Sequence, residues 1–173
     1  MPDGTRGAEL ISAGMERITN HPAVLAVEKE LRAKGFEPGV VVLPESAPTA
    51  QAAADQLGCA VGAIANSLIF EADGAPLLVL TSGAHRVDTA RVAAALGVAS
   101  LGRASKEFVY EHTGQRIGGV APVGHPKPVR TLIDGTLRVY PQVWAAAGHA
   151  HTVFAITFDE LVRVTGGAVV AVN

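Results

Sequence analysis

A tight β-hairpin is the feature of this sequence that most restricts its fold. Two apolar segments, AIANSLIFEA (63–72) and APLLVLTSG (75–83), are separated only by the pair Asp73-Gly74. An Asp-Gly pair between two such segments favours a two-residue turn in which both residues adopt positive φ angles. Strands joined in this way run antiparallel. The sequence therefore predicts a sheet that contains an antiparallel hairpin.

Short helices and strands alternate along the rest of the chain. Residues 21–35 place Val24, Val27 and Leu31 on one helix face, and Gly35 marks the end of that helix. Similar signals predict helices at 49–58, 88–97, 106–114 and 157–167, and strands at 40–46, 129–134, 143–148, 152–158 and 168–173. Hairpins outnumber clear β-α-β units. We therefore predict an α+β fold, in which a curved, mixed but mostly antiparallel, barrel-like sheet is flanked by helices.

Composition limits the class of protein. Hydrophobic residues make up 49% and charged residues 17% of the 173 residues, enough apolar material for a folded core. We expect one domain at residues 20–173 after an N-terminal tail at residues 1–19. The sequence shows no membrane-length apolar run and no evident signal peptide, and its single cysteine excludes an internal disulfide; these features predict a cytoplasmic protein. The net charge of −2 argues against nonspecific binding to duplex nucleic acid, but it permits recognition of one RNA end.

The segment IGGVAPVGHP (117–126) is the strongest candidate for a functional loop. Its glycines allow backbone N–H groups to approach a ligand, and Pro122 and Pro126 restrict its flexibility. Such N–H groups can stabilise the oxyanion that forms when water attacks an ester. The alternative is a tight glycine-rich connection that binds nothing. The sequence contains none of the usual motifs for a serine or cysteine nucleophile, a nucleotide phosphate or a zinc protease.

The histidines of GHAH (148–151) offer a second kind of chemistry. His149 and His151 would share one face of a strand, and His125 could supply a third nitrogen to a metal ion. The alternative is that these histidines bond to the backbone or line a ligand pocket. No further carboxylate or cysteine completes a ligand set, so we predict no metal and no cofactor, and keep a metal-dependent hydrolase as an alternative.

Several of these segments, in this order, resemble the YbaK/prolyl-tRNA-editing family. The resemblance runs over about residues 20–172, through TAQAAADQLG, AIANSLIF, TGQRIGGVAPVGH, TLID and AAAGHAHTVFAITFDELVRV. It implies the fold of an editing domain and a deacylase that acts in trans on a mischarged tRNA, namely a tRNA for proline that carries a small amino acid. In that family the Gly-x-x-x-Pro loop, here Gly118 to Pro122, holds the aminoacyl carbonyl, and a ribose hydroxyl of the substrate helps to activate water.

The resemblance also implies the site residues. Catalytic positions fall on Gly118, Gly119 and Asn66, and substrate-binding positions on Val120, Ala121, Pro122, Gly124, His125, Asp134, Gly148 and His149. Asn66 departs from the family, which commonly has lysine there, and an asparagine supplies hydrogen bonds but no charge. Asp134 has an equally good interpretation as a turn residue before Gly135.

The expected partners are the acceptor end of tRNA, with its 3′-terminal adenosine and aminoacyl group, and prolyl-tRNA synthetase, but no membrane and no DNA. Because Asn66 replaces the usual lysine, a family member that binds an aminoacyl-adenosine-like ligand without hydrolysing it remains an alternative.

Overall fold

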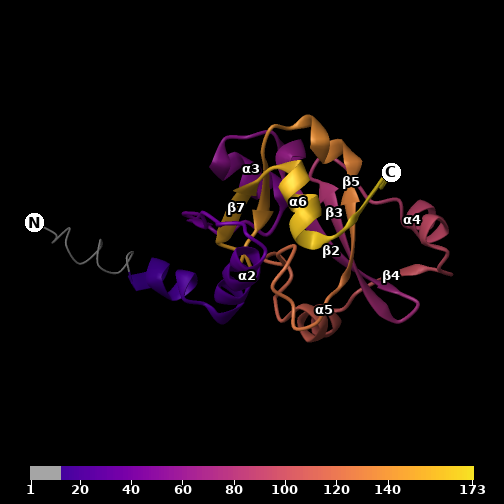
Figure 1. Cartoon of the computed structure of the whole chain (residues 1–173), viewed down its shortest axis with the longest axis horizontal. Coiled ribbons are helices and arrows are strands. Elements are labelled where there is room, and N and C mark those ends of the chain that lie inside the picture. The colour runs from indigo at the N-terminus through magenta and orange to yellow at the C-terminus, as the bar shows by residue number, and fades with distance from the viewer. Residues whose placement is uncertain (1–12) are drawn as a thin grey trace, which may run out of the picture.

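The computed structural model describes residues 13–173 (Figure 1). Part of the predicted N-terminal tail, residues 1–12, lies outside the described residues, and residues 13–19 are helical. No helix within 13–173 is long and apolar enough to cross a membrane.

The predicted hairpin forms the centre of a five-stranded sheet. Strands β2 (Ala65–Ala72) and β3 (Ala75–Ser82) pair antiparallel along their whole length. Asp73 (φ 49°) and Gly74 (φ 88°) form the turn with both φ angles positive, as an Asp-Gly pair predicts. The strand order is β4-β2-β3-β5-β8. The remaining strands are β4 (Leu101–Arg103), β5 (Arg130–Asp134) and β8 (Ala168–Val170).

A second sheet of three strands lies beside the first. It has the order β1-β7-β6, with β1 at Val41–Val42, β6 at Val143–Ala146 and β7 at Thr152–Ile156. A single parallel bridge between Ile64 and Trp144 joins the two sheets. The mixed, mostly antiparallel arrangement is confirmed, because only the β3–β5 and β5–β8 pairs are parallel. The sheets do not close into a barrel in the described part of the chain.

Five helices correspond to the five predicted ones. They are α2 (Pro22–Ala33), α3 (Ala50–Leu57), α4 (Thr89–Leu96), α5 (Lys106–Thr113) and α6 (Phe158–Thr165). Thr49, Asp88, Ser105 and Thr157 cap the last four through their side chains, and a left-handed glycine follows each of these four helices. The boundaries are therefore encoded locally.

Three apolar clusters hold these elements together. The largest lies between the sheets, where α2 and α6 pack Val27, Leu31 and Leu161 against side chains of β3, β5 and β7. Figure 1 shows α6 between β7 and the β3–β5 side of the molecule. A second cluster joins α3 to Ile64 and Val153, and a third packs α4 on the far face of the five-stranded sheet. Both faces of β3 are thereby buried.

The strand at 40–46 is shorter than predicted, and β4 was not predicted. Only Val41 and Val42 pair with β7. Pro44, two residues later, has no N–H to continue the ladder. β4 pairs with β2 only at Phe70, Glu71 and Ala72. Residues 65–69 of β2 therefore have no paired strand on that edge within residues 13–173, although β6 lies nearby, and this unpaired edge borders the candidate site.

Candidate functional site

The glycine loop begins with a tight turn at residues 116–119. The N–H of Gly119 donates to the carbonyl of Arg116 at 3.0 Å. Gly118 has φ +94°, which suits the third residue of a type II turn and disfavours any residue with a Cβ. The described hydrogen bonds use neither the N–H of Gly118 nor that of Val120. These two N–H groups therefore have no partner within residues 13–173, whereas that of Gly119 is occupied.

Gly119 lies against the segment that carries the histidines. A Cβ added at Gly119 would lie 2.7 Å from the carbonyl carbon of His149 and 2.8 Å from the nitrogen of Ala150. Real Cβ atoms do not approach backbone that closely, so only glycine fits here. This contact fixes the glycine loop relative to the β6–β7 connection.

Gln115 holds the second half of the loop, and sequence reasoning missed it. Its side chain is 1% exposed. Its Oε1 accepts from the N–H of Ala121 at 2.7 Å, and its Nε2 donates to the carbonyl of Val123 at 3.1 Å. A buried amide that satisfies two backbone groups keeps the loop in one conformation. The only sequence signal was its position directly after Gly114, which ends α5.

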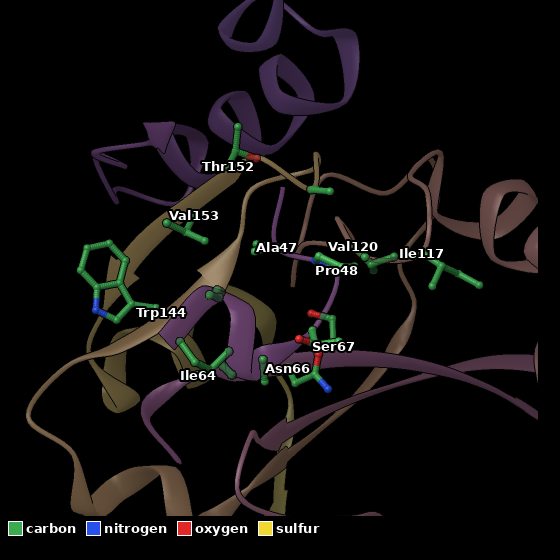
Figure 2. Close-up of a pocket in the computed structure, with 18 of the residues that line it drawn as sticks. Ala47, Pro48, Ile64, Asn66, Ser67, Ile117, Val120, Trp144, Thr152 and Val153 are labelled. Carbon is green, nitrogen blue, oxygen red and sulfur yellow. The ribbon is translucent and has the colours of Figure 1, made fainter. Parts of the chain in front are cut away.

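A cavity of about 230 Å³ opens between β2, β6, the start of α3 and the glycine loop. We call it the β2–β6 cavity. Figure 2 shows Asn66 and Ser67 on β2, with Pro48, Val120 and Ile117 near them across the pocket and Trp144 farther away. Its lining includes Gly118, Val120 and Asn66 and contains no charged residue; the other members are mainly alanine and apolar side chains.

A larger cavity of about 610 Å³, here the β2–α4 cavity, adjoins the first. Both are lined by Asn66, Ser67, Leu68, Ile117 and Val120. The larger cavity also includes three basic side chains that the smaller one lacks, namely His85, Arg86 and Arg103. The open edge of β2 therefore borders one uncharged space and one space with basic groups.

The polar side chains of the β2–β6 cavity differ in whether they have partners. Thr49 Oγ1 accepts from the N–H of Ala52, and Thr152 Oγ1 donates to the carbonyl of His149. Asn66 makes no side-chain hydrogen bond within residues 13–173, and Ser67 Oγ is buried without a partner in that part of the chain. The free polar groups thus lie on β2, opposite the free N–H groups of the loop.

Seven of the eight predicted substrate-binding residues line neither cavity, and four of these seven belong to the second half of the loop. Ala121 and Pro122 are buried in the loop, and Gly124 and His125 lie on the other side of it, in a depression beside α2. His125 Nε2 lies 2.9 Å from the carbonyl of Ala121. Burial lowers the pKa of His125, although that hydrogen bond acts in the opposite direction. Gly124 and His125 thus lie on the α2 side of the loop, away from both cavities.

Asp134 lies at the end of β5, 1% exposed, and does not line either cavity. Its carboxylate accepts from the N–H groups of Ser82 and Thr136, both at 3.0 Å, and lies 2.8 Å from Nδ1 of His85. Desolvation acts to raise the pKa of Asp134, but these hydrogen bonds outweigh it and the pKa is lowered. The Thr136 bond agrees with the turn interpretation, and His85 links Asp134 to the β2–α4 cavity.

Gly148 and His149 line a third cavity, which includes His21 and lies on the far side of Gly119. His149 Nδ1 accepts from the N–H of His151 at 3.0 Å, so that nitrogen carries no proton. Burial, together with His21 and His151, lowers the pKa of His149. Within residues 13–173, no three His, Cys, Asp or Glu side chains are grouped as a metal site. His125 lies in a different depression from His149.

The mixed, mostly antiparallel sheets and their flanking helices have the fold of an aminoacyl-tRNA editing domain. Residues 44–164 match the model of the aminoacyl-tRNA editing domain, and the chain belongs to that family.

Individual relatives agree with this assignment. The chain is 39% identical to a solved structure described as "a putative trans-editing enzyme for prolyl tRNA synthetase"; the match covers 88% of this chain and 97% of that one, with a TM-score of 0.83. It is 29% identical to the uncharacterized protein YwhH of Bacillus subtilis (strain 168), over 72% of this chain and 80% of that protein. It is also 28% identical to the proline–tRNA ligase of Xanthomonas axonopodis pv. citri (strain 306), over 71% of this chain but only 22% of the ligase. The chain thus corresponds to one part of such a ligase.

Proposed function

We propose that the protein is a trans-acting deacylase, which hydrolyses the ester between a tRNA for proline and a small, wrongly attached amino acid. Membership of the editing-domain family supports the class of reaction. The relatives connected with prolyl-tRNA synthetase support the choice of tRNA, and suggest that synthetase as a partner.

The observation that carries the proposal is the pair of free N–H groups of Gly118 and Val120 beside an uncharged cavity. Water attacks the ester carbonyl, the carbonyl oxygen becomes an oxyanion, and the two N–H groups donate to it. The bond from carbon to the ribose oxygen then breaks, and the ribose oxygen takes up the proton that the attacking water has lost. An aminoacyl ester is already activated, so orientation and oxyanion stabilisation suffice without a protein nucleophile. A ribose hydroxyl of the substrate orients the water.

The two cavities suggest how the substrate is divided. The aminoacyl side chain occupies the β2–β6 cavity, which is the smaller of the two and has no charged residue in its lining. The terminal nucleotide extends into the β2–α4 cavity, where Arg86 and Arg103 are available to a phosphate. Asn66 lines both cavities and positions the nucleotide by neutral hydrogen bonds.

A deacylation panel tests the proposal. The tRNA for proline is charged with alanine, serine, cysteine or proline, and release of each amino acid is measured with and without EDTA. We expect release of the small amino acids, retention of proline and no effect of EDTA. A matched tRNA ending in 2′-deoxyadenosine should not be deacylated, since it lacks the assisting hydroxyl.

Two results would contradict the proposal. Binding of the charged tRNA without any turnover would favour the alternative of a ligand-binding family member. Turnover that stops in EDTA and returns with added metal would favour the metal-dependent alternative.

A further inference from the structure

Ser67 carries the buried side-chain hydroxyl that has no hydrogen-bond partner within residues 13–173. Its Oγ has less than 1 Å² of accessible surface. Ser67 shares its face of β2 with Ala65 and Ile69, which pack in the apolar cluster that contains Val120. The residue itself lines the β2–β6 cavity. The residue therefore borders this cavity, while its hydroxyl is packed among apolar groups.

A serine in such a place needs an explanation, because a buried hydroxyl without a partner destabilises the fold. The neighbouring strand shows the usual arrangement: the hydroxyl of buried Ser82 donates to the carbonyl of Gly62 at 2.8 Å. Alanine at position 67 would avoid the unpaired group. A ligand that supplies the missing partner accounts for the serine.

The other lining groups restrict what that partner is. The cavity has no charged side chain, so nothing there compensates the α-ammonium group of an aminoacyl ester. The hydroxyls of Thr49 and Thr152 are already engaged with backbone groups. Of the other polar side chains that line the cavity, Asn66 is assigned above to the nucleotide, and Trp144 lies farther from Ser67 (Figure 2). A neutral polar group on the substrate side chain thus has the Ser67 hydroxyl as its partner, after rotation about χ1, which no existing hydrogen bond opposes.

We propose that Ser67 selects a small hydroxylated side chain, so that the enzyme prefers a serine ester to an alanine ester. This inference rests on the deacylase activity proposed above. Serine pairs with the Ser67 hydroxyl, whereas alanine leaves it unpaired and cysteine offers only a weak donor and acceptor. A site that hydrogen-bonds a substrate group discriminates strongly against the analogue that lacks it.

The experiment compares kcat/KM for the same proline tRNA charged with serine or alanine, each corrected for spontaneous hydrolysis. The wild-type protein should prefer serine by about 10-fold or more. Ser67→Ala should reduce kcat/KM for serine by about 10- to 100-fold and leave that for alanine within about 3-fold. Its melting temperature should not fall, because the lost hydroxyl had no partner.

Ser82→Ala is the matched control, since it removes a buried hydroxyl that has a partner and lies outside the cavity. It should lower the melting temperature and keep the ratio of serine to alanine. If both esters are hydrolysed but wild type shows no preference for serine, or Ser67→Ala keeps that preference, the inference is wrong while the deacylase proposal stands. If neither ester, nor any other of the panel, is hydrolysed, the deacylase proposal is wrong and this inference falls with it.

Discussion

Replacement of Gln115 by leucine should loosen the glycine loop and lower the stability of the whole domain. Leucine is of similar size but cannot accept from the N–H of Ala121 or donate to the carbonyl of Val123. Both of those residues are at most 3% exposed, so water does not replace the lost partner. Each unpaired group costs about 1–3 kcal/mol, and burial of the leucine side chain returns part of this.

The net loss should be about 2–4 kcal/mol, which lowers the melting temperature of a domain of this size by about 5–15 °C. Gln56→Leu is the control. The amide of Gln56 also bonds twice to backbone, to the N–H and carbonyl of Glu45, both at 3.0 Å. Those bonds are exposed, so water takes them over and the loss should stay below about 1 kcal/mol.

The assay is urea unfolding of both variants, followed by deacylation under conditions where each is folded. We expect Gln115→Leu to lose turnover even when folded, because the free N–H groups of the loop no longer stay in place. Equal stability of the two variants would refute the assignment of Gln115 as the support of the loop. Full turnover in a destabilised Gln115→Leu would show that the loop position does not control the chemistry.

Three further changes follow from the same geometry. Gly119→Ala should lower the melting temperature more than Gly97→Ala, because its Cβ would lie 2.7 Å from a backbone carbon. At Gly97 an added Cβ would have no atom within 4 Å, and only the φ of +70° is unfavourable. Equal decreases in melting temperature would contradict this prediction. Asn66→Lys should raise tRNA affinity and steepen its salt dependence by about one phosphate contact, measured by filter binding, and an unfolded variant would instead place Asn66 in the core. Because the pKa of His149 is lowered on folding, the unfolded state binds more protons below about pH 6.5, so the free energy of unfolding should fall from pH 7 to pH 5. His149→Asn should reduce this pH dependence in urea titrations, and an unchanged slope would contradict it.

The sequence was sufficient for the elements whose signals are local. Asp73-Gly74 sets the hairpin, and Thr49 and Gly58 set the two ends of α3 through bonds to backbone within a few residues. The parallel pairing of β5 with β3 and β8 was not predicted specifically, because it depends on contacts between segments that lie far apart in the chain. Three-residue β4 has too short a pattern to be recognised.

The candidate site was only partly predictable for the same reason. Asn66, Gly118 and Val120 line one cavity, and their roles in catalysis and substrate binding stay predictions. Gln115 and Ser67 were missed because their importance depends on which distant groups do or do not face them. His125 was predicted to bind the substrate, but it lines a depression beside α2 rather than the cavity that Val120 lines.

Glycine is required for different physical reasons at different positions in and around the loop. Not every glycine is therefore evidence for a functional role. Gly119, Gly124 and Gly148 each lie against backbone of another segment, where an added Cβ would come within 2.7–2.9 Å of its nearest neighbours, so packing is sufficient to require glycine there. Gly124 and Gly148 also have positive φ angles, +86° and +105°. At Gly118 a Cβ would have ordinary contacts, 3.6 Å from Pro48, and only its φ of +94° requires glycine. That φ belongs to the turn that leaves the N–H groups of Gly118 and Val120 free beside the cavity. The number of glycines therefore overstates how many serve the proposed chemistry: three of them fix the loop in place, and Gly118 forms the turn that we propose faces the substrate.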